Sequence, residues 1–436
     1  MTHFRHGARS PVKLNTNNID LLGEKWFNPG ELTAIGERMH YLLGLRNRFR
    51  YINEKNFLSE KYNSNELEIV STNVERTIAS LSSHLQGLYP QNKKLGNNLT
   101  NIQLEKSDPP IGLNDKIIQE KNKLNNSSLP NYMTLIPFKT INFNDDQNAV
   151  LSVFSKISHY SSAKSISNEF NEKYLKYFEK INKTINSYNN SLLNIYLLCD
   201  TFVADYDDAR NLSIFNEKEN FEEFYLFCQK IFNETMGQFT ENNKTISYIS
   251  GSNFMEYFVN FSKLRIDEDI ENSDLNNSNY KINTKKMVII SGHDVTLSFQ
   301  QLFIIYALEK TLELYRYPSF ASQLTFEITR KDDNKLKRNY SDYFINYYFN
   351  DELLLNMTLF EFLNKIEPNI QGNENNSQYN NSNENNSNSN ITEGNNTKNN
   401  NEIVIIKEKN KYRNAPLIIF ACLFGVSLLI NKHIFK

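Results

Sequence analysis

Residues 287–294 read Met-Val-Ile-Ile-Ser-Gly-His-Asp, an apolar run that breaks into polar residues. Four consecutive apolar residues, 287–290, are typical of a strand buried on both faces of a parallel sheet. Ser291-Gly292 interrupts this run, and a helix is expected from His293 or Asp294, because aspartate is a good helix cap. A strand that leads directly into a helix is the repeating unit of α/β folds.

The same strand-to-helix pattern occurs elsewhere. Residues 2–4 lead into the turn at Arg5-His6, and residues 67–71 lead into a helix from Thr72 whose predicted apolar face is Val74, Ile78, Leu81, Leu85 and Leu88. Thr33 is expected to cap another helix, with Ile35, Met39, Leu42, Leu43 and Phe49 on its apolar face. Later strands are expected at 324–328 and 343–349. We therefore predict an α/β fold with a mixed open sheet flanked by helices, whose ligands bind beyond the carboxyl ends of the strands.

The composition divides the chain into five expected segments. Residues 1–90 and 281–368 form the two parts of the α/β core. Residues 91–280 are rich in Asn and Lys and mostly helical in pattern, which predicts a smaller α-helical cap domain inserted over the site. Residues 369–412 are expected to be a disordered, Asn-rich stalk, and residues 413–436 a transmembrane anchor with a short basic tail.

The anchor is inferred from the apolar run 415–430, which has basic residues on both sides. As a helix this run would span about 24 Å, which is short of the roughly 30 Å hydrocarbon core but sufficient with local thinning. A core helix is disfavoured because the polar stalk separates the run from any core, and the cationic end argues against a cleaved lipid-anchor signal. If the run is an anchor, the Asn-x-Ser/Thr triplets that accept N-linked glycans, such as Asn98-Leu99-Thr100, predict a glycosylated single-pass membrane protein. The residues before the anchor would be luminal or extracellular, in a lysosome or other vesicle or at the cell surface.

Composition excludes several classes of function. The 436 residues carry 48 basic and 50 acidic side chains, so bulk charge gives no reason to expect a nucleic acid as partner. Three cysteines are too few for a disulfide scaffold. Cys199 and Cys228 form either a disulfide in an oxidising compartment or two buried free thiols. The chain has no Cys-x-x-Cys or His-x-x-x-His spacing, so we expect neither a metal nor a cofactor.

Three polar groups follow the predicted strands. In Arg5-His6-Gly7-Ala8-Arg9, two guanidinium forks suit bidentate contact with phosphoryl oxygens, and their charge keeps the histidine between them neutral. Arg76 is expected in the first turn of a helix, where free amides and the dipole already favour an anion. His293-Asp294 follows the third strand. Taken alone, the first group is equally typical of a basic surface turn, whereas Arg76 is more typical of a surface ion pair and His293-Asp294 of a helix cap.

Together these groups predict hydrolysis of a phosphate monoester. Arg5, Arg9, Arg76 and His293 would bind the phosphoryl group. His6 would attack phosphorus to form a phosphohistidine, which divides the reaction into two steps. Asp294 would protonate the leaving oxygen and then act as base on water. An acid that must be protonated and a nucleophile held neutral by cations predict an acidic pH optimum.

The motifs Arg5-His6-Gly7-x-Arg9-x-Pro11 and His293-Asp294 resemble the two signatures of the histidine acid phosphatase family. Residues 30–44, 71–77 and 85–90 resemble its lysosomal and prostatic branch, and the likeness extends from Met1 to about Glu367. The resemblance implies a mixed α/β domain with an inserted helical domain. It assigns the phosphohistidine to His6, proton donation to Asp294, and phosphate binding to Arg5, Arg9, Arg76 and His293.

Some residues depart from the family pattern. Asn73 stands where the family usually has Asp, and Ser322 stands where relatives often have Cys, so at least one familiar disulfide is missing. Only Met1 to Phe4 precede the first motif, which makes the first strand unusually short. We therefore expect an incomplete gene model that lacks an upstream strand and a signal peptide.

Other functions remain as alternatives. An inositol polyphosphate phosphatase or phytase uses the same chemistry. Lys13, two residues after Pro11, would contact an additional phosphate of such a substrate, although the position is more typical of an exposed surface lysine. Small mutase relatives are disfavoured by the long cap and by the intact His293-Asp294. A catalytically silent, glycosylated adhesion protein is the alternative from another class. The expected partners are a small-molecule phosphate monoester and a membrane, and a homodimer is left open.

Overall fold

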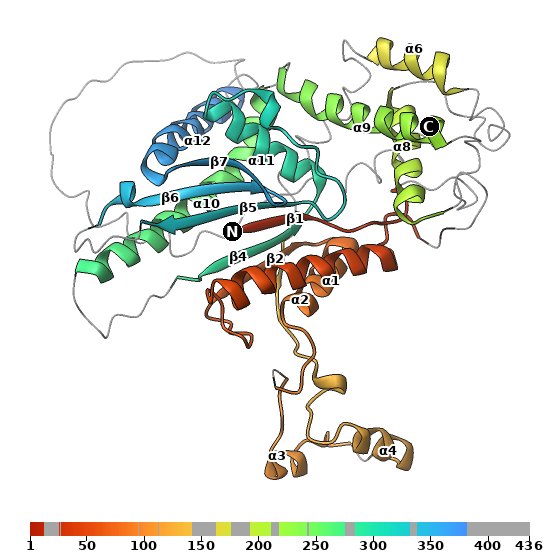
Figure 1. Cartoon of the computed structure of the whole chain (residues 1–436), viewed down its shortest axis with the longest axis vertical. Coiled ribbons are helices and arrows are strands. Elements are labelled where there is room, and N and C mark those ends of the chain that lie inside the picture. Colours follow the sequence, from red (N-terminus) through yellow and green to blue (C-terminus); the bar gives the residue numbers. More distant parts are fainter. Residues whose placement is uncertain are drawn as a thin grey trace, which may run out of the picture.

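The computed structural model describes residues 1–12, 26, 28–94, 96–111, 113–141, 163–175, 192–210, 218–241, 244–274, 284–331 and 338–381. Within this part of the chain, seven strands form one sheet in the order β3-β2-β4-β1-β5-β6-β7 (Figure 1). The strands are β1 (Thr2–Arg5), β2 (Leu67–Thr72), β3 (Lys139–Ile141), β4 (Met287–Gly292), β5 (Gln323–Arg330), β6 (Tyr343–Phe349) and β7 (Glu352–Thr358).

The sheet is mixed, as the sequence predicts. Strands β3, β2, β4 and β1 run parallel, whereas β5, β6 and β7 each pair antiparallel with their neighbours. Strand β1 lies in the middle of the sheet although it has only four residues. Thr2 pairs with Ile289 of β4 on one side and with Thr325 of β5 on the other.

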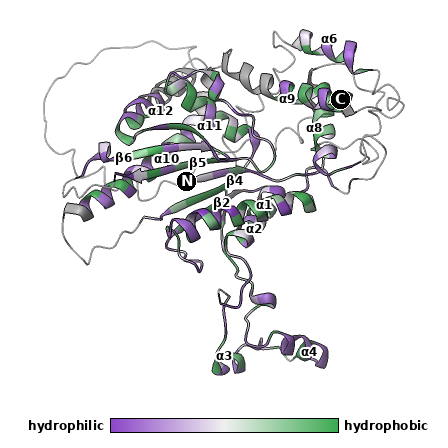
Figure 2. Cartoon of the chain, viewed as in Figure 1, coloured by the Kyte–Doolittle hydropathy of each residue, from purple (hydrophilic) through white to green (hydrophobic). Residues whose placement is uncertain are grey.

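Helices cover both faces of the sheet, which confirms the predicted α/β class (Figure 1). Helices α1 (Ala34–Arg48) and α2 (Glu75–Leu88) pack on one face, and the π-helical segment η1 (Phe49–Glu54) extends α1. Helices α10 (Lys244–Asp274), α11 (Asp294–Ala307) and α12 (Leu359–Asn381) pack on the other. Apolar residues gather on the central strands, as on β4, whereas the outlying helix α4 (Asp115–Lys123) is mostly hydrophilic (Figure 2).

A helical lobe lies beyond the carboxyl end of β1 (Figure 1). It contains α6 (Ala163–Lys173), α8 (Leu192–Asp207) and α9 (Lys218–Glu241), whose aromatic core also includes Phe299 of α11. A disulfide between Cys199 and Cys228 ties α8 to α9, so of the two alternatives for these cysteines the structure has the disulfide. The shorter elements are α3 (Asn101–Glu105) and the 3-10 turns η2 (Pro130–Tyr132), η4 (Leu312–Leu314) and η5 (Tyr340–Asp342).

Two elements inside the predicted insertion, residues 91–280, belong to the layers of the sheet. Strand β3 pairs with the edge of β2, and α10 buries Phe254, Met255 and Phe258 against the core of the sheet. Helix α12 contains Pro368 and continues to Asn381, through the first residues of the predicted stalk. The rest of the stalk and the apolar run 415–430 lie outside the described residues. Within the described part, no helix is both long enough and apolar enough to span a bilayer.

Helix α1 begins at its predicted cap but buries a different face from the predicted one. Thr33 Oγ1 accepts a hydrogen bond from Gly36 N at 3.2 Å, whereas Leu42 and Phe49 are more than half exposed. The buried face is Gly36, His40, Gly44, Asn47 and Arg48. A Cβ on Gly44 would lie 2.0 Å from the His84 carbonyl oxygen, so only glycine lets α1 approach α2 this closely.

Candidate active site

The carboxyl ends of β1 and β4 bring two distant turns together. Arg5 pairs with Gly292 in the parallel register, and His6 N donates to the Gly292 carbonyl at 3.0 Å. His6 and His293 therefore face each other, with ring centroids 5.5 Å apart and the rings nearly perpendicular. Both rings are fully buried. The structure thus places the two histidines of the distant motifs side by side.

The residue before His6 and the residue after His293 form an ion pair. Arg5 Nη2 lies 2.9 Å from Asp294 Oδ2, and both side chains are nearly buried. Arg5 Nη1 donates to the Pro318 carbonyl at 2.8 Å, and the guanidinium lies 4.2 Å from the centroid of the Phe320 ring. Burial alone would lower the pKa of Arg5, but attraction to Asp294 raises it. Arg5 is therefore charged and fixed in orientation.

Arg9 is held by a carboxylate that the sequence analysis did not single out. Its Nη2 and Nη1 atoms lie 2.7 Å and 3.3 Å from the two carboxylate oxygens of Asp200, on α8. Asp200 Oδ2 also accepts a hydrogen bond from Val12 N at 3.0 Å. Asp200 stands in the apolar stretch 197–204, and a buried acid in such a helix requires a cation or a hydrogen-bond donor as its partner. That signal was present in the sequence, although it does not identify the partner.

Arg76 lies in the first turn of α2 and is 6% exposed. The loop at Gly30, which has a positive φ of 70°, lies against this guanidinium, so a Cβ there would be 3.3 Å from Arg76 Nη1. Burial and then repulsion by Arg9 lower the pKa of Arg76 to about 9, and the carboxylates of Asp294 and Asp200 oppose the decrease. Arg76 therefore remains charged at neutral and acidic pH.

His6 is neutral and its tautomer follows from one contact. Burial lowers its pKa well below the usual 6.5, and Arg76, Arg5 and Arg9 lower it further. His6 Nδ1 lies 2.9 Å from the Gly7 carbonyl oxygen. Because a carbonyl only accepts, Nδ1 must carry the proton, which leaves the lone pair on Nε2. This form of the ring is a nucleophile.

Tight packing fixes the turn that carries His6. Gly7 N donates to Ser80 Oγ of α2 at 3.1 Å, and a Cβ on Gly7 would lie 2.4 Å from the Gly36 carbonyl oxygen of α1. His293 is fixed on its other side, since its Nε2 lies 3.1 Å from Thr72 Oγ1 at the end of β2. Helices α1 and α2 therefore hold the turn that carries His6, and the end of β2 holds the His293 ring.

The arrangement suits an anion. Arg5, Arg9 and Arg76 carry three positive charges, and Asp200 and Asp294 supply two negative charges. Within the described part of the chain, the Nε atoms of Arg5 and Arg9 are buried without a hydrogen-bond partner. A bound oxyanion would satisfy such donors. No group of three or more His, Cys, Asp or Glu suitable for a metal ion occurs among the described residues.

The structure brings together all six residues that the sequence predicts for the site. Lys13, the proposed contact for an additional phosphate, lies outside the described residues. Ser322, where relatives often have Cys, accepts a hydrogen bond at its carbonyl from Arg5 N at 2.9 Å. It therefore supports the turn through its backbone.

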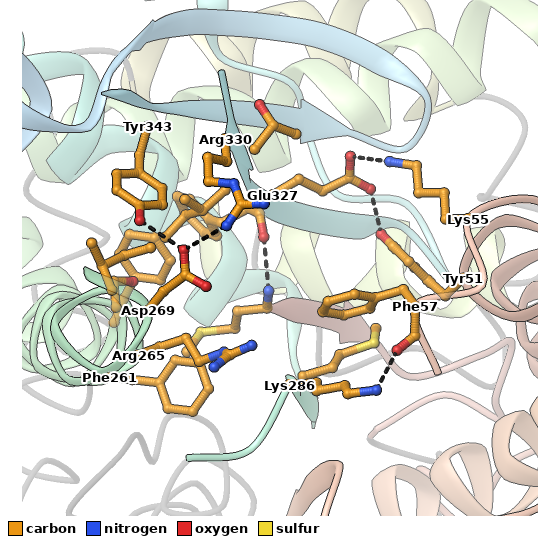
Figure 3. Close-up of a pocket in the computed structure, with 18 residues that line it drawn as sticks. Tyr51, Lys55, Phe57, Phe261, Arg265, Asp269, Lys286, Glu327, Arg330 and Tyr343 are labelled. Carbon is orange, nitrogen blue, oxygen red and sulfur yellow. Dashed lines mark hydrogen bonds and ion pairs between the residues drawn. The ribbon is translucent and has the colours of Figure 1, made fainter. Parts of the chain in front are cut away.

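A separate cavity of about 520 Å³ lies at the other end of β1 (Figure 3). Its wall includes Met1, Phe326, Arg265 and Lys286, and Asp269 accepts hydrogen bonds there from Tyr343 and Arg330. None of the six predicted site residues lines it. The candidate active site is therefore distinct from this cavity.

Comparison with known proteins places these motifs in context. The profile of the histidine phosphatase superfamily (branch 2) matches residues 4–350. Prostatic acid phosphatase of Bos taurus is 25% identical over 366 residues, which cover 80% of this chain and 76% of that protein. Lysosomal acid phosphatase of Xenopus laevis is 40% identical over 87 residues, 20% of this chain and 19% of that protein. The solved apo form of Hafnia alvei phytase is 12% identical with a TM-score of 0.47, covering 85% of this chain and 96% of that one.

Burial of neutral histidines predicts a specific pH dependence of stability. Burial lowers the pKa of His3 to about 4 and of His40 to about 3, and lowers those of His6, His84 and His293 well below 6.5. Below pH 6.5 the unfolded chain therefore binds protons that the folded chain does not. The free energy of unfolding should fall from pH 7 to pH 5, by up to about 1.4 kcal/mol per pH unit for each histidine.

Urea denaturation in phosphate-free buffer at a series of pH values measures this slope. Carboxylates such as Asp200, whose pKa is lowered by Arg9 against the effect of burial, contribute a constant amount in this range and lose their contribution only at lower pH. In a His84→Gln variant the free energy of unfolding should depend less steeply on pH, because about one proton fewer is taken up on unfolding. An unfolding free energy that is unchanged or larger at pH 5 would contradict the prediction.

Proposed function

Because the chain belongs to the histidine phosphatase superfamily (branch 2), we propose that it is an acid phosphatase that hydrolyses phosphate monoesters through a phosphohistidine. The observation that carries this proposal is the neutral, buried His6 among three arginines. Its acid phosphatase relatives support the reaction class. Phosphate monoesters are very inert, so binding and charge neutralisation must provide much of the rate enhancement.

In the first step the phosphoryl group binds to Arg5, Arg9, Arg76 and His293. His6 Nε2 attacks phosphorus, the bond between phosphorus and the leaving oxygen breaks, and Asp294 gives a proton to that oxygen. In the structure Arg5 forms an ion pair with Asp294. When the phosphoryl group binds to the Arg5 guanidinium, Asp294 loses its ion-pair partner and can transfer a proton to the leaving oxygen.

In the second step Asp294 accepts a proton from water as the water oxygen attacks phosphorus. The bond between phosphorus and His6 Nε2 then breaks, which releases inorganic phosphate and restores the neutral imidazole. His6 stays neutral in acid because burial and the arginines lower its pKa, whereas Asp294 must be protonated for the first step. The activity should therefore be greatest at acidic pH.

We also propose that the chain is a single-pass membrane protein with its catalytic domain in the lumen or outside the cell. The apolar run 415–430 and the acceptor triplets support this placement, as does the disulfide between Cys199 and Cys228. Asn98, in one such triplet, is exposed. The Asn-rich segment before the run would then act as a stalk.

Removal of the nucleophile should abolish turnover. His6→Ala is expected to lower kcat for an aryl phosphate by more than about a thousandfold, because it removes the nitrogen that would form the covalent intermediate. Assays from pH 4 to 8 should give an acidic optimum for the wild-type chain. The His84→Gln variant, at another buried histidine, controls for folding.

Three outcomes would count against this assignment. Acid-optimal activity that survives His6→Ala would contradict the mechanism, and no activity in the folded wild-type chain would favour the silent adhesion protein. Faster turnover of inositol hexakisphosphate than of the aryl phosphate would favour the phytase alternative.

Loss of the proton donor should depend on the leaving group. Asp294→Asn is expected to reduce kcat by about a hundredfold or more for an alkyl phosphate, whose alkoxide needs a proton. The loss should be much smaller for 4-nitrophenyl phosphate, since nitrophenolate leaves without protonation. Equal losses for both esters would show that Asp294 is not the general acid.

The membrane proposal is tested by fractionation of cells that express the full chain. The full chain should stay in the membrane pellet after carbonate extraction, a chain without residues 413–436 should not, and N-glycosidase should increase the gel mobility of both. A full chain that carbonate extracts, or that N-glycosidase leaves unchanged, would contradict the placement.

A further inference from the structure

One carboxylate of the helical lobe reaches into the candidate active site. Asp200, on α8, is 9% exposed and contacts both Nη atoms of Arg9. The same carboxylate accepts from Val12 N, three residues further along the turn. Asp200 therefore binds the guanidinium and the backbone of the segment that carries His6.

Asp200 is ionised in this position. Burial would raise its pKa, but the charge of Arg9, its hydrogen bonds and the Val12 amide together lower the pKa. A buried carboxylate is costly to desolvate, and the loss of one partner from such a pair leaves an uncompensated charge. Removal of either Arg9 or Asp200 should therefore strongly affect the other residue.

The pair leaves one side of Arg9 available. Nη1 and Nη2 contact Asp200, and Nη1 also donates to the Ser10 carbonyl at 3.0 Å. Within the described residues, Nε of Arg9 is buried and makes no hydrogen bond. A guanidinium is a rigid plane, so a carboxylate that holds its two Nη atoms also fixes the direction of Nε–H.

Helix α8 is itself well anchored. Cys199, adjacent to Asp200, forms the disulfide to α9, and Phe202 is fully buried in the core of the lobe. Tyr196, one turn before Asp200, packs on Phe232, which stacks on Tyr317 beside Arg5. The disulfide and these ring contacts hold the part of α8 that carries Asp200 beside Arg9.

We propose that Asp200 is a positioning residue that holds the Arg9 guanidinium with its free Nε–H toward the phosphoryl group, so that α8 sets the affinity for phosphate. This proposal rests on the proposed function. It differs from a role in stability alone, because it predicts weaker phosphate binding in chains that remain folded. It also differs from a model in which Asp200 and phosphate compete for the Arg9 guanidinium, so that Asp200 weakens phosphate binding.

The test compares Asp200→Asn with Asp205→Asn in the full chain. Asp205 is a buried aspartate on the same helix that accepts from Trp26 Nε1 at 3.0 Å, which an asparagine oxygen can also do. Two quantities are measured: the inhibition constant of inorganic phosphate against an aryl phosphate, and the increase in Tm produced by inorganic phosphate. Asp200→Asn should weaken phosphate binding about tenfold and raise KM more than it lowers kcat, and Asp205→Asn should change binding less than about twofold.

A double-mutant cycle with Arg9→Ala identifies the route of the effect. If Asp200 acts through Arg9, Asp200→Asn should change phosphate binding less than about twofold when Arg9 is already Ala. An equal loss in both backgrounds would overturn the proposal, because it would indicate general damage to the fold. Unchanged or tighter phosphate binding in Asp200→Asn would also overturn it, and the tighter result would establish competition.

The Tm measurement separates this proposal from the proposed function. Stabilisation by phosphate requires binding but no turnover. If the wild-type chain binds phosphate but hydrolyses no ester, the proposed function fails and the comparison of variants still decides the role of Asp200. If phosphate neither stabilises nor inhibits the wild-type chain, the proposal for Asp200 fails, whereas the proposed function is still decided by turnover of the ester.

Discussion

The buried cluster of positive charge at the carboxyl edge of the sheet is the constraint on which the site depends. Arg5, Arg9 and Arg76 are each at most 6% exposed, and burial together with repulsion by Arg9 lowers the pKa of Arg76 to about 9. Charges in such a position are costly unless they are paired. Asp294 and Asp200 compensate two of them. The remaining positive charge and the Nε donors of Arg5 and Arg9, which are buried without a hydrogen-bond partner in the described part of the chain, make the site complementary to an oxyanion.

The sheet determines where this charge gathers. The backbone at Arg5 and His6 is held on both sides: Arg5 N donates to Ser322 O, His6 N to Gly292 O, and Ala321 N to His6 O. Strand β1 has only four residues, but these contacts fix the start of the turn at the edge of the sheet. The backbone of this turn is thereby preorganised, although the side-chain pairs of the site can still exchange.

Local patterns in the sequence predicted the parts of the structure that depend on local interactions. The strand at 287–290, the cap at Thr33 and the turns after β1 and β4 follow from residues close in the chain. The buried face of α1 did not follow, because Gly44 and His40 are buried by close approach to α2 and by a hydrogen bond to the Arg5 carbonyl, which hydrophobicity does not reveal. Asp200 was missed for a similar reason, since its partner lies 191 residues away.

The two ion pairs of the site differ in how readily a substrate could displace the carboxylate from its arginine. Asp200 contacts both Nη atoms of Arg9 and the Val12 amide, and its helix is held by a disulfide. Asp294 contacts Arg5 through one Nη atom and accepts its other hydrogen bond from the adjacent Val295 N. A phosphoryl group bound as we propose would therefore displace Asp294 from Arg5 more easily than Asp200 from Arg9. In the proposed reaction this asymmetry keeps Arg9 fixed and frees the carboxylate that must transfer a proton.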